Sequence, residues 1–208
     1  MTRTRSPSTF LALVAGTLVL AGCALPSDRI AADRDAARWI PIEPQRARID
    51  IGRDTGIDAL AAREKRTVQG ELIEEITLGN DTAAPGENVL TLAVDYGPSS
   101  FLLADPYAVK VGQYAMTPTT VAAATRQVFD KAQQVTAPEI RANRYGPYSF
   151  ITAEYPGVAH CALAWQVVSP DLLPTIPFRK ASVRMRVCGR AADTATLLRA
   201  FDTFRLAL

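Results

Sequence analysis

The sequence predicts an α+β fold in which an antiparallel sheet of about five strands carries two helices packed on one face. Two observations lead to this class. Apolar and polar residues alternate in five short segments, as in half-buried strands, and apolar residues recur at helical spacing in two others. The order along the chain is two strands, a helix, three strands and a helix, which favours separate layers of sheet and helix.

Residues 1–22 have the layout of a secretory signal peptide. Arg3 and Arg5 precede an apolar run from Phe10 to Leu20, and small residues follow it. A helix that crosses a bilayer needs roughly 20 apolar residues, so this run is too short for an ordinary membrane span. We therefore expect an exported protein whose first 22 residues are removed.

The end of the signal, Leu20-Ala21-Gly22-Cys23, resembles the lipobox of bacterial lipoproteins. The resemblance implies that the thiol of Cys23 receives a diacylglycerol and that Cys23 becomes the new N-terminus. Several acyl chains at ~0.8 kcal/mol per buried CH₂ would hold the protein on a membrane. The alternative is an ordinary signal with a chance cysteine. Because Ala24 and not Asp follows, the pattern is similar to that of lipoproteins facing the periplasm from the outer membrane.

The mature chain carries no net formal charge. Removal of Arg3 and Arg5 lowers the 23 basic residues to 21, which equals the 21 acidic ones. A nucleic-acid partner is not expected, because such sites need a basic footprint.

Residues 23–65 are predicted to be the lipidated N-terminus followed by a flexible tether. Ala, Arg and Asp dominate this stretch, and Pro41 and Pro44 interrupt it. A flexible coil of about 40 residues has an end-to-end distance of roughly 35 Å. The folded part is then a single α+β domain over residues 66–208, which is large enough for a real core.

Two strands, residues 68–78 and 88–96, open the predicted domain. Turn-forming residues between them favour a hairpin with a long loop. Glu74 interrupts the apolar face of the first strand, and a bulge or an edge position would accommodate it. A short strand at 107–111 is expected next.

The first predicted helix follows Thr117, which suits the N-cap, and Pro118, which suits the first helical position. Its spaced face consists of Val121, Thr125, Val128, Ala132 and Val135.

Three strands and a second helix complete the expected order. The strands are residues 148–155, 160–168 and 179–188, and a Pro-Gly turn joins the first two into a hairpin. Asp193 is predicted to cap the last helix, whose apolar face is Leu197, Phe201 and Phe204.

Cys161 and Cys188 are predicted to form a disulfide, since an exported protein meets an oxidising compartment. For a separation of 27 residues the chain-entropy model gives ~3.5 kcal/mol. Cys161 shares an apolar strand face with Trp165, whereas Cys188 alternates with Arg186 and Arg184 and looks exposed. A strand end or a bulge would have to reconcile the two.

The sequence shows no catalytic constellation, so we expect no enzyme, no metal and no cofactor. The only histidine, His160, lies next to Cys161, and neighbours on a strand point to opposite faces. Zinc-ligand spacing, a nucleophile elbow and phosphate-binding glycine loops are absent. The carboxylates Glu71, Glu74 and Glu75 lie on one strand that looks structural. A hydrolase of the glycosidase type would need two carboxylates on opposite sides of a cleft, and the sequence does not show such a pair.

Two groups of residues are candidates for contact with a partner or a glycan. Tyr145 and Tyr148 lie at a predicted surface turn, where aromatic rings can stack on sugars; core packing is the alternative. Leu172, Leu173 and Ile176 lie in a proline-rich loop, which suits a partner contact but could also fold back over the sheet.

Four segments resemble the BcsN family, small lipoproteins encoded with cellulose synthesis in alphaproteobacteria: residues 84–92, 143–148, 161–166 and 184–188. The resemblance implies a pathway and not a reaction. It suggests a non-enzymatic accessory or assembly factor for exopolysaccharide, with cellulose as the expected polymer. The expected partners are the membrane through its anchor, polysaccharide synthase or export proteins, and glycan. A periplasmic carbohydrate-binding module and a periplasmic hydrolase are the alternatives.

Overall fold

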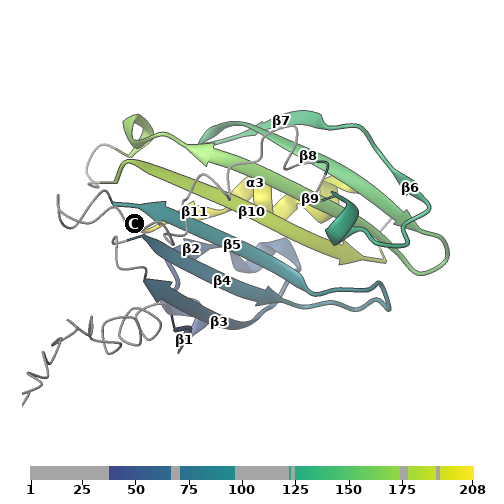
Figure 1. The fold of residues 1–208 in the computed structure, drawn as a ribbon, viewed down its shortest axis with the longest axis horizontal. Coiled ribbons are helices and arrows are strands. Elements are labelled where there is room, and N and C mark those ends of the chain that lie inside the picture. The colour runs from purple at the N-terminus through teal and green to yellow at the C-terminus, as the bar shows by residue number, and fades with distance from the viewer. Residues whose placement is uncertain (1–37, 67–70, 97–121, 123–124, 174–177, 191–192) are drawn as a thin grey trace, which may run out of the picture.

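The computed structural model describes residues 38–66, 71–96, 122, 125–173, 178–190 and 193–208, and most of them belong to one antiparallel sheet (Figure 1). Within these residues nine strands join in the order β1-β3-β4-β5-β10-β9-β8-β6, and β7 also pairs with β8. The strands are β1 (Ile40–Ile42), β3 (Ala59–Arg66), β4 (Leu72–Leu78), β5 (Asn88–Asp95), β6 (Gln134–Val135), β7 (Glu139–Asn143), β8 (Gly146–Tyr155), β9 (Ala159–Val168) and β10 (Lys180–Gly189).

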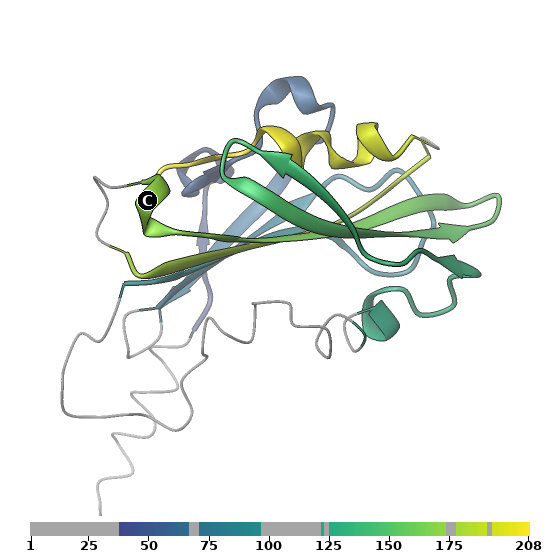
Figure 2. The ribbon, with the colours of Figure 1, turned by 90° about the horizontal axis from the view of Figure 1, so that it is seen from above.

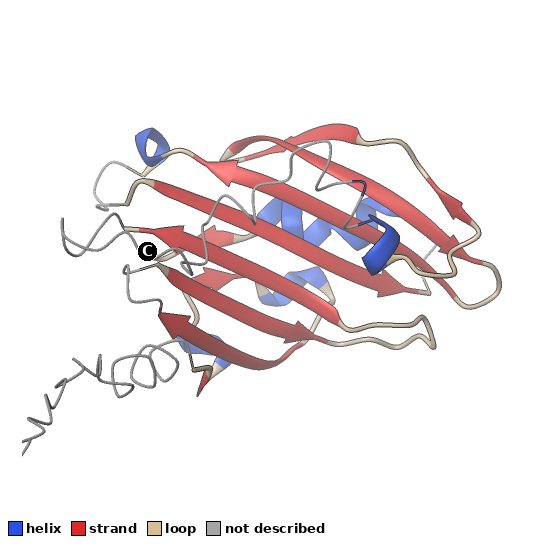
Figure 3. Cartoon of the chain, in the orientation of Figure 1, coloured by secondary structure: helices blue, strands red, loops and turns tan. Residues whose placement is uncertain are grey.

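Short elements flank the sheet (Figure 3). They are the strands β2 (Ile49–Asp50) and β11 (Arg205–Leu206), the 3₁₀ turns η1 (Pro44–Arg46), η2 (Arg53–Thr55) and η4 (Pro170–Leu172), and the helix α3 (Thr194–Thr203). β2 pairs with β11, so the beginning and the end of the described chain lie side by side.

The five strands predicted from the sequence form the contiguous centre of the sheet, β4-β5-β10-β9-β8. The β4–β5 and β8–β9 hairpins are both confirmed by antiparallel registers. The predicted number of strands is too low, because β1 and β3 extend one edge and β6 and β7 extend the other. These edge strands are mostly exposed and polar, so they lack the apolar alternation that identifies the central strands.

One face of the sheet is covered by α3 (Figure 2). As predicted, Asp193 caps this helix: its side chain accepts hydrogen bonds from the backbone N–H of Ala195 at 3.0 Å and of Thr196 at 3.2 Å. The predicted apolar residues of the helix are all buried. They pack on one face of the central strands, and Leu92, Val183 and Ala164 of these strands belong to the same apolar cluster. This is the main core.

The second face carries the other helical segment, so the prediction of both helices on one face is wrong. Residues 125–128 are helical, and Val128 and Phe129 belong to a separate apolar cluster with Ile151 and Cys161. Figure 2 shows this segment across the sheet from α3. The reason is that β8 and β9 bury apolar residues on both faces, which calls for a cover on each side. Val135 lies in β6 and not in a helix.

The boundary predicted at residue 66 falls too late. The sequence predicts a tether for residues 38–65, yet β1 and β3 lie in the sheet and Ile49 and Ile51 are buried in the main core. Ile49 and Ile51, with the partly buried Ile42 and Ile57, suffice to dock this N-terminal arm, residues 38–58. Residues 23–37 lie outside the described residues, as do the predicted strand at 107–111 and the cap at Thr117 and Pro118.

The arm brings a cation to Glu74, which is fully buried on the α3 face of β4. One carboxylate oxygen of Glu74 accepts from the backbone N–H of Arg48 at 2.7 Å, and the other from its Nη1 at 2.5 Å. Nη1 also donates to Glu64 at 2.8 Å. Burial lowers the pKa of Arg48, but its bonds to Glu74 and Glu64 outweigh this and raise the pKa above the usual value. Glu74 therefore sits in a paired core position and not at a bulge or an edge.

No helix among the described residues is long and apolar enough to cross a bilayer.

Candidate functional site at the disulfide end of the sheet

The predicted disulfide between Cys161 and Cys188 is present and joins β9 to β10. The two residues stand directly opposite each other in the register, with their Cα atoms 4.0 Å apart. Both are buried in the apolar cluster of the second face, and Arg186, which shares the face of Cys188, is buried as well. Cys188 looks exposed in the sequence because it alternates with arginines, and the sequence pattern does not distinguish a buried arginine such as Arg186 from a solvated one.

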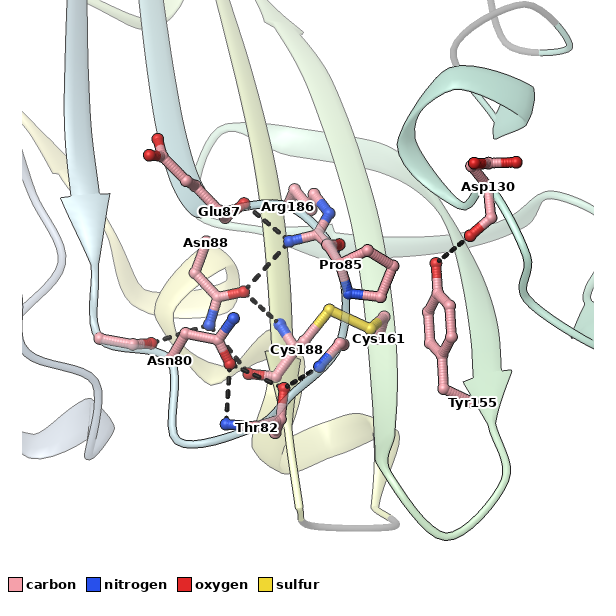
Figure 4. The surroundings of a disulfide bond; sticks show 12 residues. Asn80, Thr82, Pro85, Glu87, Asn88, Asp130, Tyr155, Cys161, Arg186 and Cys188 are labelled. Atoms are coloured by element: carbon pink, nitrogen blue, oxygen red, sulfur yellow. Dashed lines mark hydrogen bonds between the residues drawn. A yellow bond between two sulfur atoms is a disulfide. The ribbon is translucent and has the colours of Figure 1, made fainter.

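Asn88 extends the pairing of β5 and β10 past its last backbone partners. The register ends at Val89 opposite Arg186. One step further, the side chain of Asn88 accepts from the backbone N–H of Cys188 at 2.7 Å and donates to its carbonyl at 2.9 Å (Figure 4). The same amide donates to the carbonyl of Gly79 at 2.7 Å. One side chain thus ties the disulfide to both ends of the β4–β5 loop.

Replacing Asn88 by alanine is expected to lower the free energy of unfolding by about 2–3 kcal/mol, because the N–H and the carbonyl of Cys188 lose their buried partner. Chemical denaturation followed by circular dichroism measures the change. Glu87→Ala is the matched control, since Glu87 lies in the same loop with an exposed side chain, and only its backbone carbonyl accepts from Arg186. An Asn88→Ala variant no less stable than the control would contradict this role.

Arg186 binds the backbone of the β4–β5 loop. Its guanidinium donates to the carbonyls of Pro85 and, at 2.7 Å, of Glu87. Burial lowers the pKa of Arg186, an effect that the neighbouring Tyr155 partly offsets. Gly86 has a φ of +89°, and a Cβ there would lie 3.2 Å from the Arg186 guanidinium carbon, so the loop needs glycine at this position.

The loop itself is closed by local hydrogen bonds. The side-chain oxygen of Asn80 accepts from the N–H of Thr82 at 3.0 Å and from its hydroxyl at 2.7 Å. The hydroxyl of Thr82 in turn accepts from the N–H of Ala84 at 3.2 Å. Arg190, just past β10, donates from Nε to the carbonyl of Asp81 at 3.0 Å. These are the turn residues predicted between the first two strands, fixed here in one conformation.

Tyr155 closes the second face at this end. Its hydroxyl donates to the carbonyl of Asp130 at 3.1 Å, next to the helical segment (Figure 4). Burial raises the pKa of Tyr155, which keeps the hydroxyl protonated and able to donate.

An open hollow of 460 Å³ lies beside these loops. It is bounded by the β4–β5 loop, the β8–β9 turn and the end of β10. Its lining includes His160 and Arg190, with exposed Val158 as an apolar element. Within the described residues no group of three or more His, Cys, Asp or Glu side chains could hold a metal ion. The hollow combines donors, acceptors and a small apolar surface, which suits binding and supplies no activated nucleophile.

Tyr145 and Tyr148 do not form the predicted contact surface. Both rings are buried in the main core. Tyr145 stacks on Phe204 with ring centroids 5.0 Å apart, and its hydroxyl accepts from the N–H of Leu206 at 2.8 Å. The Tyr148 hydroxyl donates to Asp202 at 2.5 Å. The reason is that the turn between β7 and β8 packs against the C-terminal residues, which a local turn pattern does not reveal.

The proline-rich loop is only partly described. Leu172 is 48% exposed and stays a predicted partner contact, whereas Leu173 packs against the main core. Ile176 lies outside the described residues, and so does the predicted lipidation site Cys23.

The acidic residues considered for hydrolysis have other roles. Glu74 is bound to Arg48, and Glu75 forms an ion pair with Arg63 at 2.5 Å on the opposite face. Glu71 is buried. Adjacent strand positions face opposite sides, so Glu74 and Glu75 cannot flank one substrate.

Comparison with known proteins decides the family. The model of the family described as cellulose biosynthesis protein BcsN matches residues 55–208. The chain belongs to the BcsN family. This confirms the resemblance found in the sequence and connects the chain with cellulose biosynthesis. The BcsN match contains the whole disulfide end, while β1 and β2 of the arm precede it. No curated protein and no solved structure matches the chain.

Proposed function

We propose that this protein is a lipid-anchored, non-enzymatic accessory factor of cellulose biosynthesis and secretion, facing the periplasm from the outer membrane. The observation that carries the proposal is the BcsN family match over residues 55–208. The lipobox-like sequence ending at Cys23 supports the anchor. The role is that of an assembly factor for polysaccharide synthase or export proteins.

The state of the reactive side chains supports a role without catalysis. Cys161 is oxidised in the disulfide, and Glu74 is neutralised by Arg48 inside the core. His160 is not hydrogen-bonded to a carboxylate or a hydroxyl among the described residues, so it has no partner to activate. Instead, Asn88 and Arg186 hold the β4–β5 loop in place by hydrogen bonds at one end of the sheet, and such a fixed loop suits a binding surface.

Deletion of the gene tests the proposal. Exported cellulose should fall, while synthase activity in isolated membranes should stay at the wild-type level. A deletion strain with normal export would refute the role in secretion. A strain whose membranes lose synthase activity would refute the separation of this protein from synthesis.

Complementation tests the predicted partner contact at Leu172. We expect a Leu172→Asp variant to restore less export than the wild type, because a charge on an exposed apolar contact is costly to bury. Ile140→Asp is the matched control, since Ile140 is 75% exposed on β7 at the edge of the sheet. Equal complementation by both variants would exclude Leu172 as a contact.

A further inference from the structure

A row of polar side chains crosses three strands on the α3 face, next to the disulfide end. Glu154 of β8 stands opposite His160 of β9 on one side and opposite Gln134 of β6 on the other. Directly opposite residues share a face, so the three side chains form one line. Thr152 lies two residues before Glu154 on β8, and Thr136 follows the end of β6; their hydroxyl oxygens are 3.3 Å apart.

This row borders a hollow of 140 Å³, which has room for several water molecules. Thr194, the first residue of α3, and the buried side chain of Leu197 close it from the helix side. The hollow therefore has a polar rim and an apolar element, as small-molecule sites do.

The three polar side chains of this row keep their hydrogen-bonding groups free of partners in the part of the chain that the structure describes. Among the described residues, the side chains of Gln134, Glu154 and His160 have no hydrogen bond or ion pair with one another or with other residues. A carboxylate accepts, an imidazole and a carboxamide both donate and accept, and threonine hydroxyls do the same. Six such side chains line this one small space: Gln134 and Thr136 in and just after β6, Thr152 and Glu154 in β8, His160 in β9 and Thr194 in α3.

This chemistry fits an uncharged polyhydroxyl ligand. The only carboxylate in the hollow is Glu154, and no lysine or arginine lines it, which disfavours an anion. One carboxylate and one imidazole fall short of a metal site. A pyranose ring offers hydroxyl groups around its edge and an apolar C–H face, which matches the polar rim and Leu197.

The ligand can be longer than one ring. His160 also lines the 460 Å³ hollow described above, where Thr82, Val158 and Arg190 lie. The two hollows thus share His160 as a lining residue, which places them next to each other at the ends of β8 and β9 and suits a ligand that extends from one to the other.

We propose that the two hollows around His160 bind consecutive pyranose units of a neutral polysaccharide, with one ring seated between Glu154, His160 and Thr194. The proposal deepens the proposed function and rests on it, since cellulose is a polymer of this class. It also moves the glycan contact from the buried tyrosines to side chains that are accessible.

Ligand-observed saturation-transfer NMR tests the site with the full-length lipoprotein purified in detergent. The probes are cellotetraose and the N-acetylated chitotetraose, which distinguish a glucan from a peptidoglycan-like chain. We expect saturable binding of at least one probe. Glu154→Ala and His160→Ala should each weaken it about tenfold, the usual effect of losing one charged or buried hydrogen-bond partner.

Glu139→Ala is the matched control, because Glu139 is an exposed carboxylate on β7 that lines neither hollow. Its binding should equal that of the wild type, and the thermal midpoints of all the variants should agree. Binding of neither probe would overturn the proposal, as would binding that both Glu154→Ala and His160→Ala leave unchanged. If the deletion strain still exports less cellulose in that case, the glycan site fails while the accessory role stands.

Discussion

Replacement of Arg48 by alanine is expected to lower the free energy of unfolding by about 3–5 kcal/mol, the largest effect of any single substitution considered. The variant leaves the carboxylate of Glu74 fully buried without its cation. Breaking one side of a buried pair is costly because the remaining carboxylate stays out of water and keeps only the backbone N–H of residue 48 as a partner on this arm. Chemical denaturation of the wild type and the variant measures the difference.

Two further variants separate the charge from the loss of a side chain. Arg46→Ala removes an exposed arginine of the same arm and should change stability by less than ~0.5 kcal/mol. The double variant Arg48→Met with Glu74→Met should recover most of the loss, since an apolar pair can replace a buried ion pair at little cost. If Arg48→Ala matched Arg46→Ala, the arm would not be an integral part of the fold.

Removal of the disulfide by the double variant Cys161→Ala and Cys188→Ala is expected to cost ~3.5 kcal/mol. For a domain of this size that corresponds to a fall in the thermal midpoint of roughly 10 °C. The loss arises mainly because the unfolded chain is no longer constrained over the sequence separation of 27 between the cysteines.

A reductant provides the internal control. It should lower the thermal midpoint of the wild type toward that of the double variant and leave the variant unchanged. A wild-type midpoint insensitive to complete reduction would show that the clamp between β9 and β10 contributes nothing to stability.

The central strands could be predicted because buried strands need apolar residues at regular local spacing. β4, β5, β8, β9 and β10 each alternate or run apolar over at least seven residues, and the Asp193 cap identifies α3. β3 could not be predicted in the same way. Only Ala62 of its eight residues is buried, and the register shifts between Ala59 and Ala61, so the strand has no apolar period.

The side-chain errors share one physical cause, which is contact between segments far apart in the chain. Arg48 meets Glu74 across 26 residues, and Arg186 meets the Pro85 carbonyl across 101. Tyr145 is buried by Phe204 and Leu206, which arrive from the C-terminus. The disulfide, by contrast, followed from counting cysteines in an exported chain. The row of Gln134, Glu154 and His160 becomes visible only once the strand register is known.

The structure also brings the folded part closer to the proposed anchor. The chain between Cys23 and the first described residues is about 15 residues long and not about 40, so its fully extended length is at most about 55 Å. We therefore expect the domain to work near the membrane surface, within reach of membrane-bound export proteins.

Intact mass spectrometry of the protein isolated from its native membrane tests the anchored role most directly. The expected mass is that of residues 23–208 with a diacylglycerol on the thiol of Cys23 and an acylated N-terminus. An unmodified thiol at Cys23, or a chain that still begins at Met1, would contradict the membrane attachment from which the proposed role in cellulose secretion follows.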